Sequence, residues 1–191
     1  MEILKKRILK DSIVLPGNII KVGSFLNHMV DIELMKEIGE EFTRIFGPAK
    51  PSKILTIEAA GIPIAAMTAL ALNIPFIIAK KYDSIEFVNP AEDYAAKVTS
   101  YTKKSQHIIR VSKAFIDSDD KVLVLDDILA NGDAAKGLID IISQSKAELV
   151  GFGACIEKSF QEGAAELKAI GINLHSLVRV KSLDGGVISF H

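Results

Sequence analysis

The stretch 121–137, KVLVLDDILANGDAAKG, runs from an apolar segment into two adjacent carboxylates. Residues 122–125 have the composition of a buried strand, and Asp126 and Asp127 follow directly. Two neighbouring acids repel each other, and burial would raise their pKa values. The 2′- and 3′-hydroxyls of a ribose ring could donate to both carboxylates. The pair therefore indicates a sugar site; the simpler alternative is a solvated turn that caps a helix.

The residues that follow the two acids are small and open a predicted helix over 133–145. The backbone N–H groups of such a turn point outward, and the helix dipole favours an anion there. Small side chains also let a phosphate approach the backbone closely. Acids for a sugar and amides for a phosphate together predict a ribose 5-phosphate site. The phosphate-binding residues would be Ala130, Asn131, Gly132, Asp133 and Ala134.

Strands and helices alternate along most of the chain, which predicts βαβ units in an α/β fold with a mostly parallel sheet covered on both faces. Residues 1–30 do not fit the alternation and are expected to form a cap outside the sheet, and residues 81–106 read as a long irregular excursion. We expect one domain over 1–191. The expected strands are 53–57, 75–80, 108–112, 121–125, 148–157 and 173–180, and the expected helices are 31–46, 63–72, 133–145 and 161–170.

Composition narrows the class of protein. The chain has 191 residues, a formal net charge of −1 and 49% hydrophobic residues, so no basic field indicates nucleic-acid binding. Its single cysteine, Cys155, excludes an internal disulfide and fits a reducing cytosol. The sequence contains no run of about 18 apolar residues, so we expect no membrane span.

Two further clusters fall at predicted strand ends, where open α/β sheets bind ligands. Glu58, Ala59, Ala60 and Gly61 follow the strand 53–57, and Lys80 with Lys81 closes the strand 75–80. The small residues of the turn would let a ligand approach the backbone, and the two lysines could bind an anion. The alternatives are an ordinary tight turn and a solvated sheet edge.

The end of the strand 148–157 carries two residues suited to a flat, polar ligand. Lys158 could donate a hydrogen bond to an oxygen of such a ligand, and Phe160 could stack on its ring system. The alternative is that both side chains are simply at the surface.

LVLDDILANGDAA resembles the phosphoribosyl diphosphate motif of type I phosphoribosyltransferases, and the match is closest to their xanthine phosphoribosyltransferase branch. The segments IIKVGSFLNHMVD, ILTIEAAGIPIAAMTAL, SYTKKSQHIIRVS and IEKSFQEG extend the resemblance over nearly the whole chain. The resemblance implies a type I phosphoribosyltransferase fold with a base-binding hood at 1–30 and a flexible active-site loop at 81–106. It also implies xanthine and phosphoribosyl diphosphate as substrates, Mg²⁺ carried mainly by the diphosphate, cytoplasmic purine salvage and a homodimer.

The resemblance also implies roles for individual residues. Asp126 and Asp127 would hold the ribose hydroxyls directly or through Mg²⁺, and residues 130–134 would bind the 5-phosphate. Residues 58–61 with Lys80 and Lys81 would bind the diphosphate, and no protein side chain would be a primary metal ligand. The residues implied to contact the base are Ile20, Asn27, Lys158 and Phe160.

One departure from the family pattern concerns residues 130–134, which we call the phosphate turn because they are predicted to bind the 5-phosphate. Most members place Thr or Ser there, whereas this chain has Asn131 and Ala134, so phosphate binding would rest on backbone amides and the Asn131 side chain. The four histidines show no metal-ligand spacing and are interpreted as surface or core residues. Two alternatives remain: a phosphoribosyltransferase for hypoxanthine and guanine or for adenine, and a non-catalytic regulator of transcription that senses phosphoribosyl diphosphate.

Overall fold

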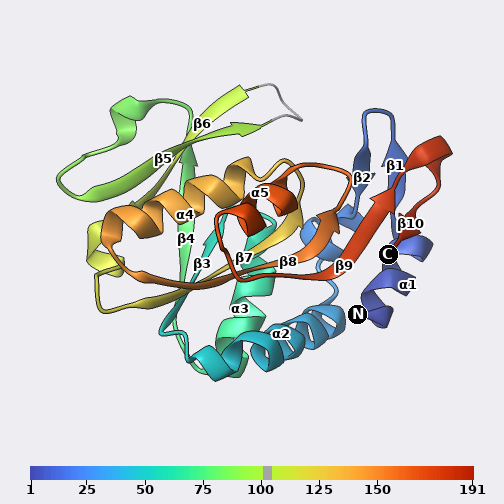
Figure 1. Ribbon diagram of the computed structural model, residues 1–191, viewed down its shortest axis with the longest axis horizontal. Coiled ribbons are helices and arrows are strands. Elements are labelled where there is room, and N and C mark those ends of the chain that lie inside the picture. Colours follow the sequence, from blue (N-terminus) through green and yellow to red (C-terminus); the bar gives the residue numbers. More distant parts are fainter. Residues whose placement is uncertain (101–104) are drawn as a thin grey trace.

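The computed structural model describes residues 1–100 and 105–191, and its centre is an eight-stranded mixed sheet (Figure 1). The strand order is β10-β9-β8-β7-β3-β4-β6-β5. Strands β9, β8, β7, β3 and β4 run parallel, and the outer strands are antiparallel. The bounds are β3 (Lys53–Ile57), β4 (Phe76–Tyr82), β5 (Asp93–Ser100), β6 (Ser105–Ser112), β7 (Lys121–Leu129), β8 (Glu148–Lys158), β9 (Leu174–Ser182) and β10 (Ser189–Phe190).

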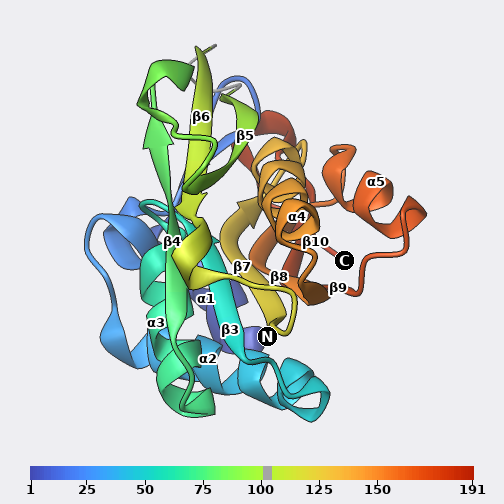
Figure 2. The ribbon, with the colours of Figure 1, turned by 90° about the vertical axis from the view of Figure 1, so that its left-hand side faces the viewer.

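Helices cover both faces of the parallel strands (Figure 2). Helices α2 (Ile32–Phe46) and α3 (Gly61–Leu72) lie on one face, and α4 (Asp133–Ser145) and α5 (Gly163–Ala169) lie on the other. Each face has its own hydrophobic core: the first lies under α2 and α3, and the second lies under α4 and α5. Because side chains alternate along a strand, Ile54 belongs to the first core and Leu55 to the second. These strands are buried on both sides, which explains why they read as continuous apolar runs.

Short polar signals set the helix ends. The Asp31 side chain accepts a hydrogen bond from the Leu34 N–H at 3.2 Å and caps α2. Helix α3 ends at Asn73, which has φ of 55° in the left-handed region. Helix α4 begins after Gly132, whose φ of 85° suits glycine. The expected helices at 31–46, 63–72, 133–145 and 161–170 are therefore present, with small shifts at their ends.

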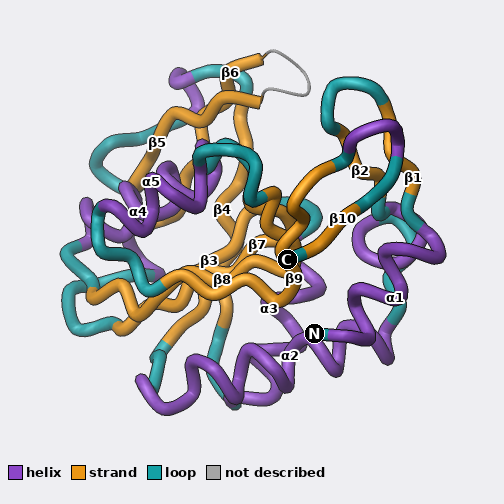
Figure 3. The backbone as a smooth tube through the Cα atoms, turned by 45° about the vertical axis from the view of Figure 1, so that its right-hand side comes forward, coloured by secondary structure: helices purple, strands orange, loops and turns teal. Residues whose placement is uncertain are grey.

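The first thirty residues lie outside the main sheet, as expected. They form α1 (Glu2–Asp11), the hairpin β1 (Ile13–Leu15) and β2 (Ile19–Lys21), and a helical turn η1 (Gly23–Asn27). We call residues 1–30 the hood. Leu4 and Ile8 of α1 are fully buried, and the Met1 ammonium donates to the Leu177 carbonyl at 2.8 Å. Figure 3 shows the hood beside the β9 and β10 end of the sheet.

The expectation of an irregular excursion over 81–106 was wrong, because strand β5 and the start of β6 occupy much of it. The small buried residues Ala96 and Val98 pack β5 on the second core, and such a face is hard to see in the sequence. Residues 101–104 of the segment that carried the loop hypothesis lie outside the described residues. Flexibility of the 81–106 loop stays a prediction.

None of the helices in the described part of the chain is both long enough and apolar enough to cross a membrane.

Candidate functional site

The predicted clusters meet at one edge of the sheet. Strands β8, β7, β3 and β4 are adjacent and parallel, so their carboxyl ends lie side by side. In sheets of this kind ligands bind at that edge. The clusters that arrive there are Lys158–Phe160 after β8, Asp126–Ala134 at the end of β7, Glu58–Gly61 after β3 and Lys80–Lys81 in β4.

The two central acids lie inside the end of β7 rather than beyond it. The strand continues to Leu129, and Asp126 is paired with Ala154 and is only 6% exposed. Asp127 is half-buried and donates its N–H to Asp126 Oδ1 at 2.9 Å. The expected strand end at residue 125 was wrong: β7 continues through both acids to Leu129, and Asp126 is buried within it.

Burial and mutual repulsion act on this pair. Burial raises the pKa of Asp126 well above its usual range, and the neighbouring Asp127 charge raises it further. Burial also raises the pKa of Asp127. Lys81 lies near enough to Asp126 to lower its pKa slightly, but the net shift remains upward. A ligand that donates hydrogen bonds or brings positive charge would therefore be bound favourably at this point.

Asp127 connects the acid pair to the hood and to β8. The Asn27 side chain hydrogen-bonds to the Asp127 carboxyl and opposes the upward shift of its pKa. Burial lowers the pKa of Lys158, and the charge of Asp127 partly offsets that shift. Two of the predicted base-binding residues, Asn27 and Lys158, thus lie near Asp127, and Lys81 lies near Asp126.

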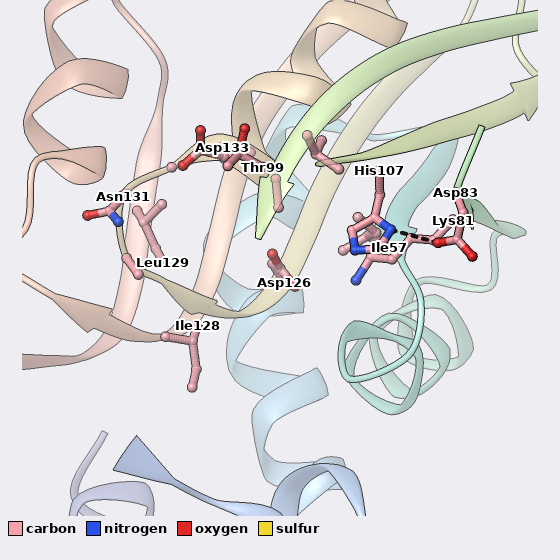
Figure 4. Close-up of a pocket in the computed structure, with 15 residues that line it drawn as sticks. Ile57, Lys81, Asp83, Thr99, His107, Asp126, Ile128, Leu129, Asn131 and Asp133 are labelled. Atoms are coloured by element: carbon pink, nitrogen blue, oxygen red, sulfur yellow. Dashed lines mark hydrogen bonds and ion pairs between the residues drawn. The ribbon is translucent and has the colours of Figure 1, made fainter. Parts of the chain in front are cut away.

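The phosphate turn borders a cavity of about 470 Å³ at the end of β7 (Figure 4). Asp126, Lys81 and all five residues 130–134 line this cavity. The residues of the turn lead into α4, so backbone N–H groups and the helix dipole favour an anion here. The remaining predicted site residues do not line it: Glu58, Ala59, Ala60, Gly61, Lys80, Asp127, Ile20, Asn27, Lys158 and Phe160.

Gly163 supports the back of the phosphate turn. Its N–H donates to the Ala130 carbonyl at 3.1 Å. A Cβ at Gly163 would lie 2.5 Å from the Ala130 oxygen and 2.6 Å from the Gly132 nitrogen, both of which are backbone atoms. Only glycine lets α5 approach the turn this closely. Sequence reasoning did not single out Gly163, because the need for glycine there arises from close packing that is visible only in the structure.

The turn after β3 is held against β7. The peptide bond between Glu58 and Ala59 is cis. The buried Thr56 hydroxyl donates to the Leu125 carbonyl at 2.8 Å, one residue before the acids. A Cβ at Gly61 would lie 2.1 Å from Thr56 Oγ1 and 3.4 Å from Asp126 Oδ1. The requirement for glycine at position 61 therefore comes mainly from the close approach of the Thr56 hydroxyl, and the acid pair lies just beyond it.

Glu58 turns back toward the end of β4. Its carboxylate accepts from the Lys81 N–H and pairs with the Lys80 ammonium at 3.3 Å. Lys80 and Lys81 are both exposed at the edge of the site. This placement puts two ammonium groups where an anion bound at the 58–61 turn would meet them.

The residues predicted to contact the base come from the hood and from the end of β8. Lys158 Nζ donates to the Asn18 carbonyl of the hood hairpin at 2.8 Å. Ile20 is buried in the hood core, and Phe160 is exposed at the edge. Lys158 thus connects the hood to the sheet.

Glu157 fixes the end of β8 beside Lys158. Its buried carboxylate accepts from Ser159 Oγ at 2.6 Å, Ser176 Oγ at 2.7 Å and Arg179 Nε at 3.0 Å. Burial alone would raise the pKa of Glu157, but these donors outweigh burial and lower it. Sequence reasoning missed this anchor because two of its three partners, Ser176 and Arg179, come from β9.

Sequence reasoning missed three polar residues that line the cavity. Asp83, Thr99 and His107 line it from β5, β6 and the turn after β4 (Figure 4). Asp83 and Thr99 fall in the segment 81–106 that was predicted to be irregular, and His107 was interpreted as a surface or core residue. Only the pairing of β5 with β6 and of β6 with β4 brings them to the site.

The residues of the site fit a metal ion that arrives bound to the ligand, not one held by the protein alone. Among residues 1–100 and 105–191, no group of three or more His, Cys, Asp or Glu side chains could hold a metal ion. Asp126 and Asp127 offer carboxylate oxygens, which are hard ligands suited to Mg²⁺. An ion that takes most of its ligands from phosphate oxygens fits this donor set.

No protein-family model matches the chain. Solved structures with similar folds include adenine phosphoribosyltransferase from Rhodothermus marinus DSM 4252, with a TM-score of 0.74 and 23% identity over 94% of this chain and 97% of that chain. Another is adenine phosphoribosyltransferase from Trypanosoma brucei in complex with AMP, pyrophosphate and ribose-5-phosphate, with a TM-score of 0.73 and 19% identity over 92% and 79% of the two chains. At these identities the likeness shows the fold, which is the expected α/β fold of type I phosphoribosyltransferases.

Sequence relatives are much closer. The chain is 47% identical over 190 residues to xanthine phosphoribosyltransferase from Ligilactobacillus salivarius, covering 100% of this chain and 98% of that protein. It is 48% identical over 190 residues to xanthine phosphoribosyltransferase from Oceanobacillus iheyensis, covering 100% and 97%. Identity at this level over the full length confirms the resemblance seen in the sequence, and the chain belongs to the xanthine phosphoribosyltransferase family.

Proposed function

We propose that this protein transfers the 5-phosphoribosyl group of phosphoribosyl diphosphate to N9 of xanthine, releasing xanthosine 5′-monophosphate and pyrophosphate in purine salvage. The observation that carries the proposal is the acid pair with raised pKa values that adjoins the phosphate turn. A ribose 5-phosphate carries a diol that could bind the acid pair and a phosphate that could bind the adjoining turn. The xanthine phosphoribosyltransferases that match the full chain support the choice of base.

The sugar phosphate is held by Asp126, Asp127 and residues 130–134. The carboxylates accept hydrogen bonds from the 2′- and 3′-hydroxyls, and the turn donates backbone N–H groups to the 5-phosphate. Because this chain has no hydroxyl side chain at 130–134, the amides and the Asn131 side chain supply the donors. Both groups are positioned before the ligand arrives, which lowers the entropic cost of orienting the reacting carbon.

The diphosphate leaving group is held by the 58–61 turn with Lys80 and Lys81. Mg²⁺ carried by the diphosphate would neutralise part of the charge that develops as the C1′–oxygen bond breaks. Lys81 lines the cavity with Asp126, so its ammonium faces the diphosphate across the sugar. These cations stabilise charge that is larger in the transition state than in the bound substrate.

The base is oriented by the hood and the end of β8. Asn27 both donates and accepts, and Lys158 donates to an oxygen of the purine. Phe160 stacks on the ring, and buried Ile20 shapes the hood. Closure of the 81–106 loop would exclude water from the oxocarbenium-like ribosyl centre, which water would otherwise capture.

We also propose a cytoplasmic homodimer. Several large apolar side chains of the hood and of the start of α2 are exposed, and a second copy of the chain would cover such a surface. These side chains are Ile3, Leu9, Ile13, Met29 and Ile32. Sedimentation equilibrium should give about twice the chain mass of 20.7 kDa, and a monomer would refute the dimer.

A panel of bases tests the function. Pyrophosphate release is measured with Mg²⁺, phosphoribosyl diphosphate and xanthine, guanine, hypoxanthine or adenine in turn. We expect the highest kcat/KM with xanthine. Turnover of adenine but not xanthine would refute the choice of base and the role of Lys158. Tight operator DNA binding without pyrophosphate release would establish the regulator instead.

A glycine substitution tests the phosphate turn. Gly163→Ala would push a methyl group into the backbone of residues 130–132, and the N–H groups would shift away from the phosphate. We expect the KM for phosphoribosyl diphosphate to rise about tenfold, since misplacement of about 1 Å is costly in a positioned site.

Gly171→Ala is the matched control. Gly171 has φ of 81° and no atom within 4 Å of an added Cβ, so this variant is strained but touches no part of the site. It should lower Tm with an unchanged KM. Equal KM values for Gly163→Ala and the wild type would show that the turn does not depend on α5.

A further inference from the structure

His107 lies on the wall of the phosphate cavity opposite the turn 130–134. Figure 4 shows it with Lys81 and Asp83 on one side of the cavity and Asn131 and Asp133 on the other. Among the described residues that line the cavity, Lys81 and His107 are the basic ones. The two come from the adjacent strands β4 and β6.

The hairpin of β5 and β6 fixes this wall against α4. His107 pairs with Val98, so the two side chains lie on the same face of the hairpin. That face packs on α4, because a Cβ at Gly137 would lie 2.5 Å from Val98 Cγ1. Gly137 therefore brings the hairpin close to the helix whose amino end carries the phosphate turn.

Asp83 orients the imidazole. Asp83 Oδ1 lies 3.1 Å from His107 Nδ1, and the Asp83 side chain is 94% exposed while that of His107 is 21% exposed. A pair this exposed contributes little to folding stability. A carboxylate on Nδ1 does set the ring orientation of a histidine. The contact therefore serves to hold the ring on the cavity wall.

We propose that His107, positioned by Asp83, is a further binding residue that donates a hydrogen bond to the diphosphate of phosphoribosyl diphosphate. The inference rests on the proposed function, because it assigns a further hydrogen-bond donor to the same leaving group. A diphosphate has several acceptor oxygens, more than Lys80, Lys81 and the 58–61 turn need to occupy. The 5-phosphate is bound by the turn on the opposite wall, so His107 acts at the other end of the substrate.

Calorimetric titration tests this without a base. Phosphoribosyl diphosphate with Mg²⁺ and, separately, ribose 5-phosphate are titrated into the wild type, His107→Gln and the matched control His191→Gln, which makes the same change at the exposed last residue. We expect His107→Gln to raise the Kd for phosphoribosyl diphosphate about tenfold, which is the effect of losing one hydrogen bond to a charged group. Ribose 5-phosphate, which lacks the diphosphate, should bind all three proteins equally.

Asp83→Asn provides a second variant, and it should not impair folding because the Asp83 side chain is exposed. It should raise the Kd for phosphoribosyl diphosphate by a smaller factor, about threefold, because the His107 ring would be less well oriented. If the wild type binds the diphosphate ester and both variants bind it equally well, the role of His107 is refuted while the proposed function stands. If the wild type binds neither ligand, the proposed function itself fails.

Discussion

Replacing Asp126 and Asp127 together by asparagine is expected to lower kcat/KM for xanthosine 5′-monophosphate formation at least about 10³-fold. An amide carries no charge and presents an NH₂ group where the ribose hydroxyls need acceptors. The change therefore removes both the charge and half of the acceptor capacity at the reacting sugar. Steady-state kinetics with both substrates varied measure the loss.

The same double variant should fold at least as well as the wild type. Because both folded-state pKa values are raised, the folded protein binds protons more readily than the unfolded chain, and ionised carboxylates oppose folding as pH rises above their ordinary pKa. Asparagine removes that cost and keeps Oδ1 as acceptor for the Asp127 N–H. We expect an unchanged or higher Tm at neutral pH. An active double variant would refute the ribose assignment.

Replacing Lys158 by methionine is expected to lower kcat/KM for xanthine about 10²-fold, because a half-buried, charged hydrogen-bond donor to the substrate would be lost. Methionine retains most of the side-chain packing. The KM for phosphoribosyl diphosphate should stay within about twofold, since Lys158 does not line the cavity that adjoins the phosphate turn. Kinetics with each substrate varied separately distinguish these outcomes.

Lys168→Met makes the same chemical change at an exposed residue of α5 and should leave both KM values unchanged. The hydrogen bond of Lys158 to the Asn18 carbonyl offers a second reading, in which the lysine merely holds the hood. A hood-only role would change the turnover of every base equally. A selective loss for oxopurines supports direct contact with the base.

Much of the site could be predicted because its signals are local. The apolar run followed by Asp126 and Asp127 and the small turn before α4 need only neighbours in the sequence. The parallel order of the strands then brings these residues to one edge. The expected start of the helix at residue 31 is likewise a local signal, because Asp31 caps α2.

The features that were missed depend on contacts between distant segments. Strand β5 is recognisable only once Val98 packs on Gly137 of α4, and His107 reaches the cavity only through the pairing of β6 with β4 and β5. Asp126 belongs to the sheet because β8 continues beside it as far as Lys158. Neither strand pairing nor a close glycine contact leaves a periodic pattern in one sequence.

The most direct test of the account is a crystal structure with xanthosine 5′-monophosphate bound. We expect the phosphate within hydrogen-bond distance of the backbone N–H groups of residues 131–134 and the ribose hydroxyls on Asp126 and Asp127. The purine should lie between the hood and Phe160 with an oxygen facing Lys158. A nucleotide whose phosphate lies elsewhere, with the acid pair contacting only water, would contradict the account.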